Sequence, residues 1–262
     1  MNTRPDILAP RSAHALASFA QTRVLLGFDF DGVLAPIARA PEGAHARART
    51  LRLLAAVAAR YPCIVVSGRA FDDLAPRLRG VPLRLVAGNF GHEMGRSGRR
   101  PPAVVRHWVA ALTDSLAGEA GVRIEDKRYS VAVHYRHAPD RGRARRRIRR
   151  AAAALPGARM LSGTLAMSLL PASGPDKGVA LQTACRRFSC ERAIYVGDDG
   201  TDEDAFASAP PDRLLAVRVG GGASAAQYRL ARQRDIDALL QRLLVLRSEP
   251  RADGPGGGAS RG

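Results

Sequence analysis

Lysine, cysteine and aromatic residues are all scarce in this 262-residue sequence. Aromatic side chains make up 5% of the chain, which argues against a binding surface built mainly from Trp and Tyr. The three cysteines are too few and too irregularly spaced for a disulfide framework or a zinc site. No apolar run approaches the ~18 residues of a membrane-spanning helix, and the first 21 residues lack the apolar core of a signal peptide. We therefore expect a cytoplasmic protein without a membrane partner.

The formal net charge of +17 rests almost wholly on arginine, because Lys127 and Lys177 are the only lysines. A nucleic-acid partner is usually indicated by a local basic patch, whereas these arginines are scattered along the chain. The densest run, residues 145–150, is more typical of the solvated face of a surface helix. We expect no nucleic-acid partner and keep a non-catalytic polyanion-binding protein as the least favoured alternative. A lysine retained among so many arginines indicates a need for a compact ammonium group.

Short apolar runs alternate with helical patterns in both outer parts of the chain. Runs such as VLLGFDF and CIVV are mostly apolar at successive positions, as parallel strands buried on both faces require. The strands are expected at residues 24–30, 63–66, 83–87, 193–196 and 214–219. Helices are expected at residues 50–60, 74–78, 177–186 and 236–247. This alternation predicts an α/β fold with a Rossmann-like parallel sheet, whose ligands bind beyond the carboxyl ends of the strands.

The pattern changes in the middle of the chain, after a Gly-, Arg- and Pro-rich linker at residues 95–102. A helix, two strands, a second helix and two further strands follow, at residues 104–116, 122–125, 130–135, 141–154, 159–161 and 165–170. We interpret this segment as an inserted α+β module with an antiparallel sheet. The expected domains are therefore a first part of the core at 1–95, the inserted module at 96–170, a second part of the core at 171–247, and a disordered Gly-rich tail at 248–262.

Two carboxylates close the first predicted strand. Asp29 and Asp31 lie two positions apart, and the period of a strand places both side chains on one side of the chain. Such a pair can divide its work, one carboxylate attacking or holding a metal while the other moves a proton. Taken alone, the pair is equally well explained as a cap at the end of the strand.

Three further signals fall at the same edge of the predicted sheet. Ser67 and Gly68 follow the second strand, where a hydroxyl and backbone N–H groups can hold a phosphate oxygen. An acidic loop at 198–204 follows a later strand, and a hard cation such as Mg²⁺ would relieve its mutual repulsion. Lys177, at a helix start, can neutralise a phosphate or an attacking carboxylate. Each signal has an ordinary structural explanation, but their coincidence at one edge favours phosphoryl transfer.

In this order, the motifs DFDGVL, VVSGR, DKG and GDDGTDED resemble those of the haloacid-dehalogenase-like phosphatases. The resemblance implies that Asp29 attacks a phosphate monoester to give an aspartyl-phosphate. Asp31 would protonate the leaving alcohol and later activate water. Mg²⁺ would be held by Asp29, by the backbone carbonyl of Asp31 and by Asp198, with Asp202 nearby. The residues implied for the phosphoryl oxygens are Ser67 and Lys177.

Longer segments narrow the resemblance to the trehalose-6-phosphate phosphatases, from about Leu25 to Leu244. They are DFDGVLAPI, VVSGR, EDKRYSVAVHYR, PASGPDKGVAL, IYVGDDGTDEDAF and VGGGASAAQYRL. The inserted module would then be a cap that closes over the sugar and excludes water. On this cap, Glu125 and Lys127 would bind the disaccharide hydroxyls, unless they form an ion pair at a strand edge. The remaining substrate contacts would come from the VVSGR motif, at Ser67, Gly68 and Arg69.

Some features of the sugar-binding region stay open. His134 and Arg136 alternate on one face of a strand and fit a structural or a substrate-facing role equally. Ser168 stands where the family usually has a glutamate, and residues 89–93 depart from its usual His-Gly pattern. We expect Mg²⁺-dependent hydrolysis of trehalose 6-phosphate to trehalose and phosphate. The main alternative is a phosphatase for another sugar phosphate, with a phosphosugar mutase less favoured.

Overall fold

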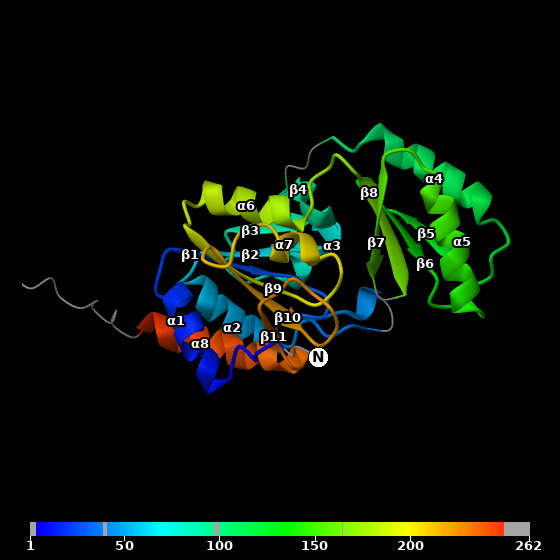
Figure 1. Cartoon of the computed structure of the whole chain (residues 1–262). Coiled ribbons are helices and arrows are strands. Elements are labelled where there is room, and N and C mark those ends of the chain that lie inside the picture. Colours follow the sequence, from blue (N-terminus) through cyan, green and yellow to red (C-terminus); the bar gives the residue numbers. More distant parts are fainter. Residues whose placement is uncertain (1–3, 39–40, 97–99, 164, 249–262) are drawn as a thin grey trace, which may run out of the picture.

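The computed structural model describes residues 4–38, 41–96, 100–163 and 165–248. The described chain folds around two sheets, one of seven strands and one of four, as Figure 1 shows. The Gly-rich tail, expected to be disordered, lies outside the described residues beyond Ser248, and so do residues 97–99 of the expected linker. In the part of the chain that is described, no helix has the length and apolar character needed to cross a membrane.

The larger sheet has the strand order β11-β10-β9-β1-β2-β3-β4. Six strands pair in parallel, and only β4 runs antiparallel, against β3. The chain leaves β1 toward β2 and β3 and returns on the other side of β1 as β9, so that ligand-binding loops meet at this switch point. The bounds are β1 (Val24–Phe28), β2 (Cys63–Val66), β3 (Leu85–Gly88), β4 (Glu93–Met94), β9 (Arg192–Gly197), β10 (Leu214–Val219) and β11 (Tyr228–Leu230).

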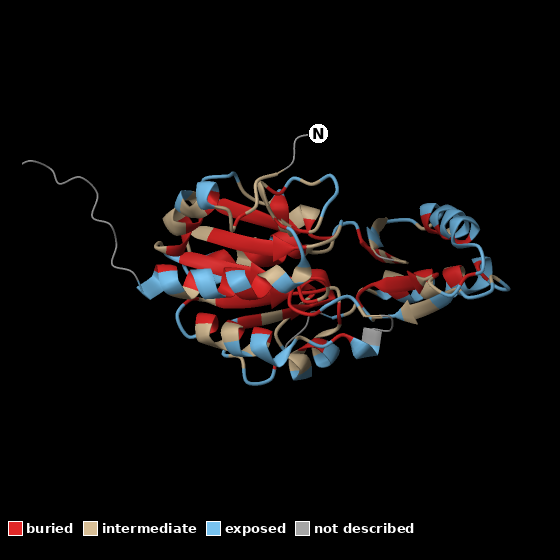
Figure 2. Ribbon diagram, turned by 90° about the horizontal axis from the view of Figure 1, so that it is seen from below, coloured by how far each residue is buried: buried red, intermediate tan, exposed pale blue. Residues whose placement is uncertain are grey.

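Helices cover both faces of this sheet, which explains why its central strands are apolar throughout. Leu26 and Phe28 pack in one core cluster with side chains from α1, α2, α3 and α8, whereas Leu25 packs in another with α6 and α7. Figure 2 shows the buried strands between half-exposed helices. The helices are α1 (Ala13–Ala20), α2 (Ala48–Ala58), α3 (Phe71–Arg77), α6 (Lys177–Arg187), α7 (Glu203–Phe206) and α8 (Ile236–Ser248), with 3-10 turns η1 (Pro10–Ser12), η2 (Pro41–Gly43), η3 (Asn89–Gly91) and η4 (Gln233–Asp235).

The smaller sheet, which we call the cap sheet, is antiparallel throughout, with the strand order β5-β6-β8-β7. One of its faces packs on two helices through a cluster that contains Val131, Val133, Trp108 and Ile148. The other face is turned toward the loops of the larger sheet (Figure 1). The elements are α4 (Ala103–Ser115), β5 (Arg123–Asp126), β6 (Val131–His134), α5 (Arg141–Ala153), β7 (Ala158–Gly163) and β8 (Ala166–Pro171).

The predicted α/β class is confirmed, and every predicted strand and helix is present with ends shifted by a few residues. One boundary was wrong in a way that affects the site. The first strand was expected to run through Phe30, but β1 ends at Phe28, so Asp29 already belongs to the following loop. Helices α1 and α7 and the short strands β4 and β11 were not predicted, and α7 begins within the expected acidic loop. The domain limits at residues 96 and 170 remain our interpretation.

Arg159 of β7 ties the cap sheet to the core. Its guanidinium forms ion pairs with Asp176, at a distance of 3.3 Å, and with Asp204. Asp176 is the N-cap of α6, where its side chain accepts a hydrogen bond from the Val179 N–H at 2.8 Å. The same arginine therefore contacts two segments of the core: the start of α6 and the end of the acidic loop.

We expect Arg159→Met to loosen the cap on the core. Partly exposed ion pairs contribute up to about 1 kcal/mol, so backbone hydrogen exchange in residues 172–176 should rise by up to about fivefold. Arg145→Met, which alters an exposed arginine of α5, is the matched control and should leave this exchange unchanged. Equal exchange in the two variants would contradict a tie through Arg159.

Candidate active site

Asp29 lies at the floor of a cavity of about 440 Å³ between the two sheets. Its backbone N–H donates to the Val196 carbonyl at 2.9 Å, which extends the pairing of β1 with β9 by one residue. One carboxylate oxygen accepts a hydrogen bond from the Phe30 N–H at 2.7 Å. Burial of Asp29 leaves 5% of the residue exposed. The end of the central strand thus holds this carboxylate in a fixed position.

Lys177 is the buried cation of the site. Its Nζ lies 2.9 Å from Asp29 Oδ2 and 2.8 Å from Asp202 Oδ1, and the residue is 1% exposed. Burial by itself would lower the pKa of Lys177, but the charges of Asp202 and Asp29 outweigh it and raise that pKa well above its usual value. The lysine therefore stays protonated and neutralises part of the acidic cluster.

Asp202 organises the acidic loop. Its Oδ1 also accepts from the Tyr195 hydroxyl at 2.9 Å, and its Oδ2 accepts from the N–H groups of Asp198 and Asp199 at 2.9 and 3.2 Å. Gly197 leaves room for this carboxylate, because a Cβ there would collide with it. With both oxygens engaged, Asp202 shapes the loop and is poorly placed to serve as a ligand.

Asp198 lies over the turn that follows β1. The turn requires glycine at position 32 for two reasons. The φ of Gly32 is +77°, and a Cβ there would collide with the Asp198 carboxylate. Burial raises the pKa of Asp198 to about 8, with further contributions from the like charges of Asp199 and Asp202. The pKa of Asp29 is raised well above its usual value by burial, and Lys177 only partly opposes this effect.

These acids fit a hard divalent cation. Carboxylate oxygens of Asp29, Asp198 and Asp202 lie within 4.8 Å of one another. Since Asp202 is already saturated by hydrogen bonds, Asp29 and Asp198 are the two carboxylates left to face a cation. One ammonium among several close carboxylates leaves excess negative charge, and oxygen donors of this kind suit Mg²⁺. The predicted metal residues Asp29 and Asp198 are therefore brought together.

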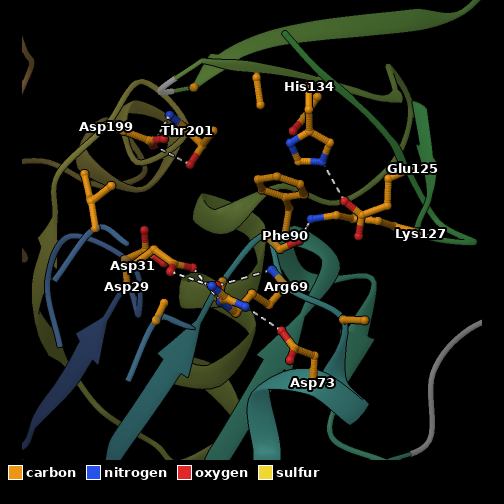
Figure 3. Close-up of a pocket in the computed structure, with 18 of the residues that line it drawn as sticks. Asp29, Asp31, Arg69, Asp73, Phe90, Glu125, Lys127, His134, Asp199 and Thr201 are labelled. Carbon is orange, nitrogen blue, oxygen red and sulfur yellow. Dashed lines mark hydrogen bonds and ion pairs between the residues drawn. The ribbon is translucent and has the colours of Figure 1, made fainter. Parts of the chain in front are cut away.

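Asp31 is turned to a different partner. Its two carboxylate oxygens accept hydrogen bonds from Arg69, at 2.7 Å from Nε and 2.8 Å from Nη2, and Arg69 also pairs with Asp73 at 2.6 Å. Because β1 ends at Phe28, the strand period that predicted a common side for Asp29 and Asp31 does not apply. Both residues nevertheless line the cavity (Figure 3).

Ser67 and Gly68 border the cavity at the end of β2, as predicted. The Ser67 hydroxyl accepts from the Arg69 N–H at 3.2 Å and retains its own proton for donation. The Gly68 carbonyl accepts from Lys127 Nζ at 3.1 Å. Phe90, which was not predicted to line the site, packs so closely over Gly68 that a Cβ there would come within 2.6 Å of its ring. The sequence could not predict this placement, because Phe90 adopts a φ of +59° and a phenylalanine does not indicate a left-handed backbone.

The opposite wall of the cavity is formed by the cap sheet. Glu125 pairs with His134 at 2.7 Å between Oε2 and Nε2, and this hydrogen bond is the main cause that lowers the pKa of Glu125. Lys127 instead reaches the core at Gly68, and burial lowers its pKa. Glu125 and Lys127 therefore have separate partners and do not form the ion pair that was considered as an alternative. Arg136 and Ser168 also line the cavity, and Arg136 donates to the Ala38 carbonyl at 3.1 Å.

The fold and the placement of these acids indicate the class of protein to which the chain belongs. The chain has the fold of the haloacid-dehalogenase-like (HAD) superfamily, as its match to a solved HAD sugar phosphatase of subclass IIB shows. That match has a TM-score of 0.60 at 16% identity and covers 83% of this chain and 98% of the other. The C-terminal domain of the Candida albicans trehalose-6-phosphate phosphatase matches with a TM-score of 0.79 at 19% identity, over 94% of this chain and 99% of that one.

The chain belongs to the trehalose-phosphatase family, whose model matches residues 27–233. Among curated relatives, the trehalose-phosphate phosphatase of Mycobacterium marinum is 34% identical over 200 residues. The matched region covers 71% of this chain and 51% of that protein, so the chain spans about half the length of this relative. The resemblance inferred from the motifs is confirmed.

Removal of a divalent cation should lower Tm by a larger amount at higher pH. In the metal-free protein the pKa of Asp198, about 8, lies above the ~3.9 of an unfolded aspartate, so the folded state binds the additional proton between these values. Asp198 therefore favours folding most below about pH 4, and this contribution is lost as the pH rises to about 8. A bound cation favours the ionised form. We expect Mg²⁺ to raise Tm more at pH 8 than at pH 6.

Thermal unfolding with Mg²⁺ or with a chelator at both pH values measures this difference. Asp198→Asn should remove most of the dependence on pH, whereas Asp212→Asn, at an exposed acid, should preserve it. A shift of equal size at the two pH values would refute the role of Asp198.

Proposed function

We propose that this protein is a Mg²⁺-dependent phosphatase that hydrolyses trehalose 6-phosphate to trehalose and phosphate. The observation that carries the proposal is the ion pair of Asp29 with Lys177 at the floor of a cavity whose opposite wall bears Glu125 and Lys127. A carboxylate aimed into a cavity with a cation beside it suits attack on a phosphate, and polar groups across from it suit a sugar. Family membership supports the same substrate, and a cytoplasmic location accords with it.

The reaction proceeds in two displacements. A carboxylate oxygen of Asp29 attacks phosphorus, the bond from phosphorus to the sugar oxygen breaks, and Asp31 gives its proton to the leaving alkoxide. A water molecule then gives a proton to Asp31 and attacks phosphorus, which breaks the bond to Asp29 and releases phosphate. For this role the Asp31 side chain must turn from Arg69 toward the sugar oxygen. We expect Asp31 to leave Arg69 and turn toward the sugar oxygen when the substrate binds in the cavity.

The remaining residues neutralise and orient the phosphoryl group. Lys177 and the Ser67 hydroxyl hold phosphoryl oxygens, with backbone N–H groups of the Ser67–Arg69 turn beside them. Asp29, the Asp31 carbonyl and Asp198 would hold a Mg²⁺ ion, which would neutralise charge on the phosphate and favour the ionised form of Asp29. On the cap, Glu125 and Lys127 bind sugar hydroxyls, and Arg69 completes the substrate contacts from the core.

A second candidate is a phosphatase for another sugar phosphate. It is favoured by Ser168, which lines the cavity at the middle of β8, where the family usually has a glutamate. A serine offers a neutral and shorter side chain there, so the sugar that fits beside it can differ. The phosphoryl-transfer chemistry is the same for both candidates, because Ser168 lies on the cap.

Phosphate release by the purified protein with Mg²⁺ tests the two candidates. We expect trehalose 6-phosphate to exceed sucrose, glucose and mannose 6-phosphates and an aryl phosphate by a hundredfold or more in kcat/KM, roughly 3 kcal/mol of transition-state discrimination. A chelator should abolish the activity. A preference for another sugar phosphate would refute the substrate and leave the mechanism standing, and inactivity on the whole panel would refute both.

Asp29→Asn should abolish turnover and preserve the fold. The amide is nearly the same size as the carboxylate, but it is a poor nucleophile, and we expect kcat to fall by at least about 10⁴-fold. Because burial and nearby acids raise the pKa of Asp29, loss of its charge should leave Tm unchanged or higher. Turnover near that of the wild type would exclude Asp29 as the nucleophile.

A further inference from the structure

His134 and Glu125 form a polar pair on the face of the cap sheet that lines the cavity. In the pairing of β5 with β6, His134 lies opposite Arg123, and Glu125 lies opposite Ala132, so the two side chains are diagonal neighbours on one face. His134 Nε2 lies 2.7 Å from Glu125 Oε2, with the side chains 21% and 35% exposed. Figure 3 shows the imidazole and the carboxylate directed toward each other beside Lys127.

The neighbouring positions on this face are small. Ala166 lies opposite His134 across the β6–β8 pair, Gly163 lies opposite Ala166 on β7, and Ser168 is two residues further along β8. All three line the cavity. On this part of the wall, the long polar side chains therefore come from β5 and β6 and from the residues that follow these strands, such as Lys127 and Arg136. A sugar would meet its polar contacts along one edge of the cap sheet.

His134 lies on the face of the cap sheet that is turned away from the packed helices. The hydrophobic cluster beneath the cap sheet is built from the residues of the opposite face, among them Val131 and Val133. His134 is directed into the cavity, where its ring contacts Glu125. Two cations lie near the carboxylate. Arg123 is 60% exposed and 3.9 Å away, so solvent screens it, and the Lys127 ammonium donates to the Gly68 carbonyl.

We propose that His134 is a positioning residue that holds the Glu125 carboxylate in place for recognition of the sugar. This inference rests on the proposed function, since it concerns the same cavity. His134 engages Oε2 and leaves Oε1 to accept a hydrogen bond from a sugar hydroxyl. A half-exposed glutamate without this partner would have to lose its side-chain freedom when the sugar binds, which weakens binding. The phosphoryl-transfer residues lie on the other sheet and do not contact His134.

The test compares His134→Ala, His134→Gln and the control His137→Ala, whose histidine is exposed and outside the cavity. For His134→Ala we expect KM for trehalose 6-phosphate to rise roughly tenfold with little change in kcat, because the lost contact serves binding equally in ground and transition states. The aryl phosphate, which the cap does not bind, should lose far less. His134→Gln should recover most of the loss, since its amide can donate to Oε2. His137→Ala should behave as the wild type.

The outcomes separate this inference from the proposed function. Equal losses on the sugar and aryl phosphates, or a fall in Tm that accounts for the loss, would show a purely structural role and overturn the inference. An unchanged KM in His134→Ala would also overturn it. If another sugar phosphate proves to be the best substrate, the proposed function fails, and the same comparison on that substrate still decides the role of His134. A wild type that does not distinguish sugar from aryl phosphates would overturn both.

Discussion

The site depends on one buried ammonium group. Lys177 is held between Asp29 and Asp202, which follow two neighbouring strands, and loss of the ammonium would leave two buried carboxylates without a counter-charge, which typically costs about 3–5 kcal/mol. Because Asp202 also accepts the N–H groups of Asp198 and Asp199, this lysine fixes the acidic loop as well as the nucleophile. The arrangement carries more negative than positive charge, so the folded chain is prepared for a further cation. A guanidinium in place of Lys177 would bring a larger, planar group into the narrow space between Asp29 and Asp202, which explains a lysine in a chain so rich in arginine.

The two sheets divide the chemistry between them. The core holds the acids and the lysine, whereas the cap sheet presents Glu125, Lys127 and His134 across the cavity. Lys127 connects the two sides, because it donates to the Gly68 carbonyl and so joins the cap wall of the cavity to the turn that precedes Arg69. Arg69 in turn holds Asp31. The cap position is therefore coupled, through a short chain of polar contacts, to the residue proposed to move protons. Such coupling suits an enzyme that must exclude water before the phosphoryl group is transferred.

The sequence was sufficient to predict the α/β class, a second sheet that is antiparallel, and the grouping of the candidate residues after β1, β2 and β9 around one cavity, because parallel strands buried on both faces leave continuous apolar runs. It was not sufficient for contacts that depend on register or on unusual backbone. The His134–Glu125 pair exists because β5 and β6 align Glu125 with Ala132, and a shift of one residue would put the two side chains on different faces. Likewise, the placement of Phe90 over Gly68 follows from a left-handed backbone that neither residue's identity requires. The Asp31–Arg69 pair was missed because the strand period was extended past its true end.

Recognition along one edge of the cap has a consequence for specificity. Where a buried polar group is built to bind a hydroxyl, an analogue without that hydroxyl leaves the group unpaired and is strongly rejected. Where the wall is made of Gly163, Ala166 and Ser168, a small change in the sugar alters little, since a site lined by small side chains rejects such changes weakly. Discrimination should therefore concentrate on the hydroxyls next to Glu125 and Lys127, and the sugar's opposite side should tolerate variation. If the cap binds a sugar as proposed, Ser168 would broaden the set of sugars that fit, and the oriented carboxylate of Glu125 would restrict that set.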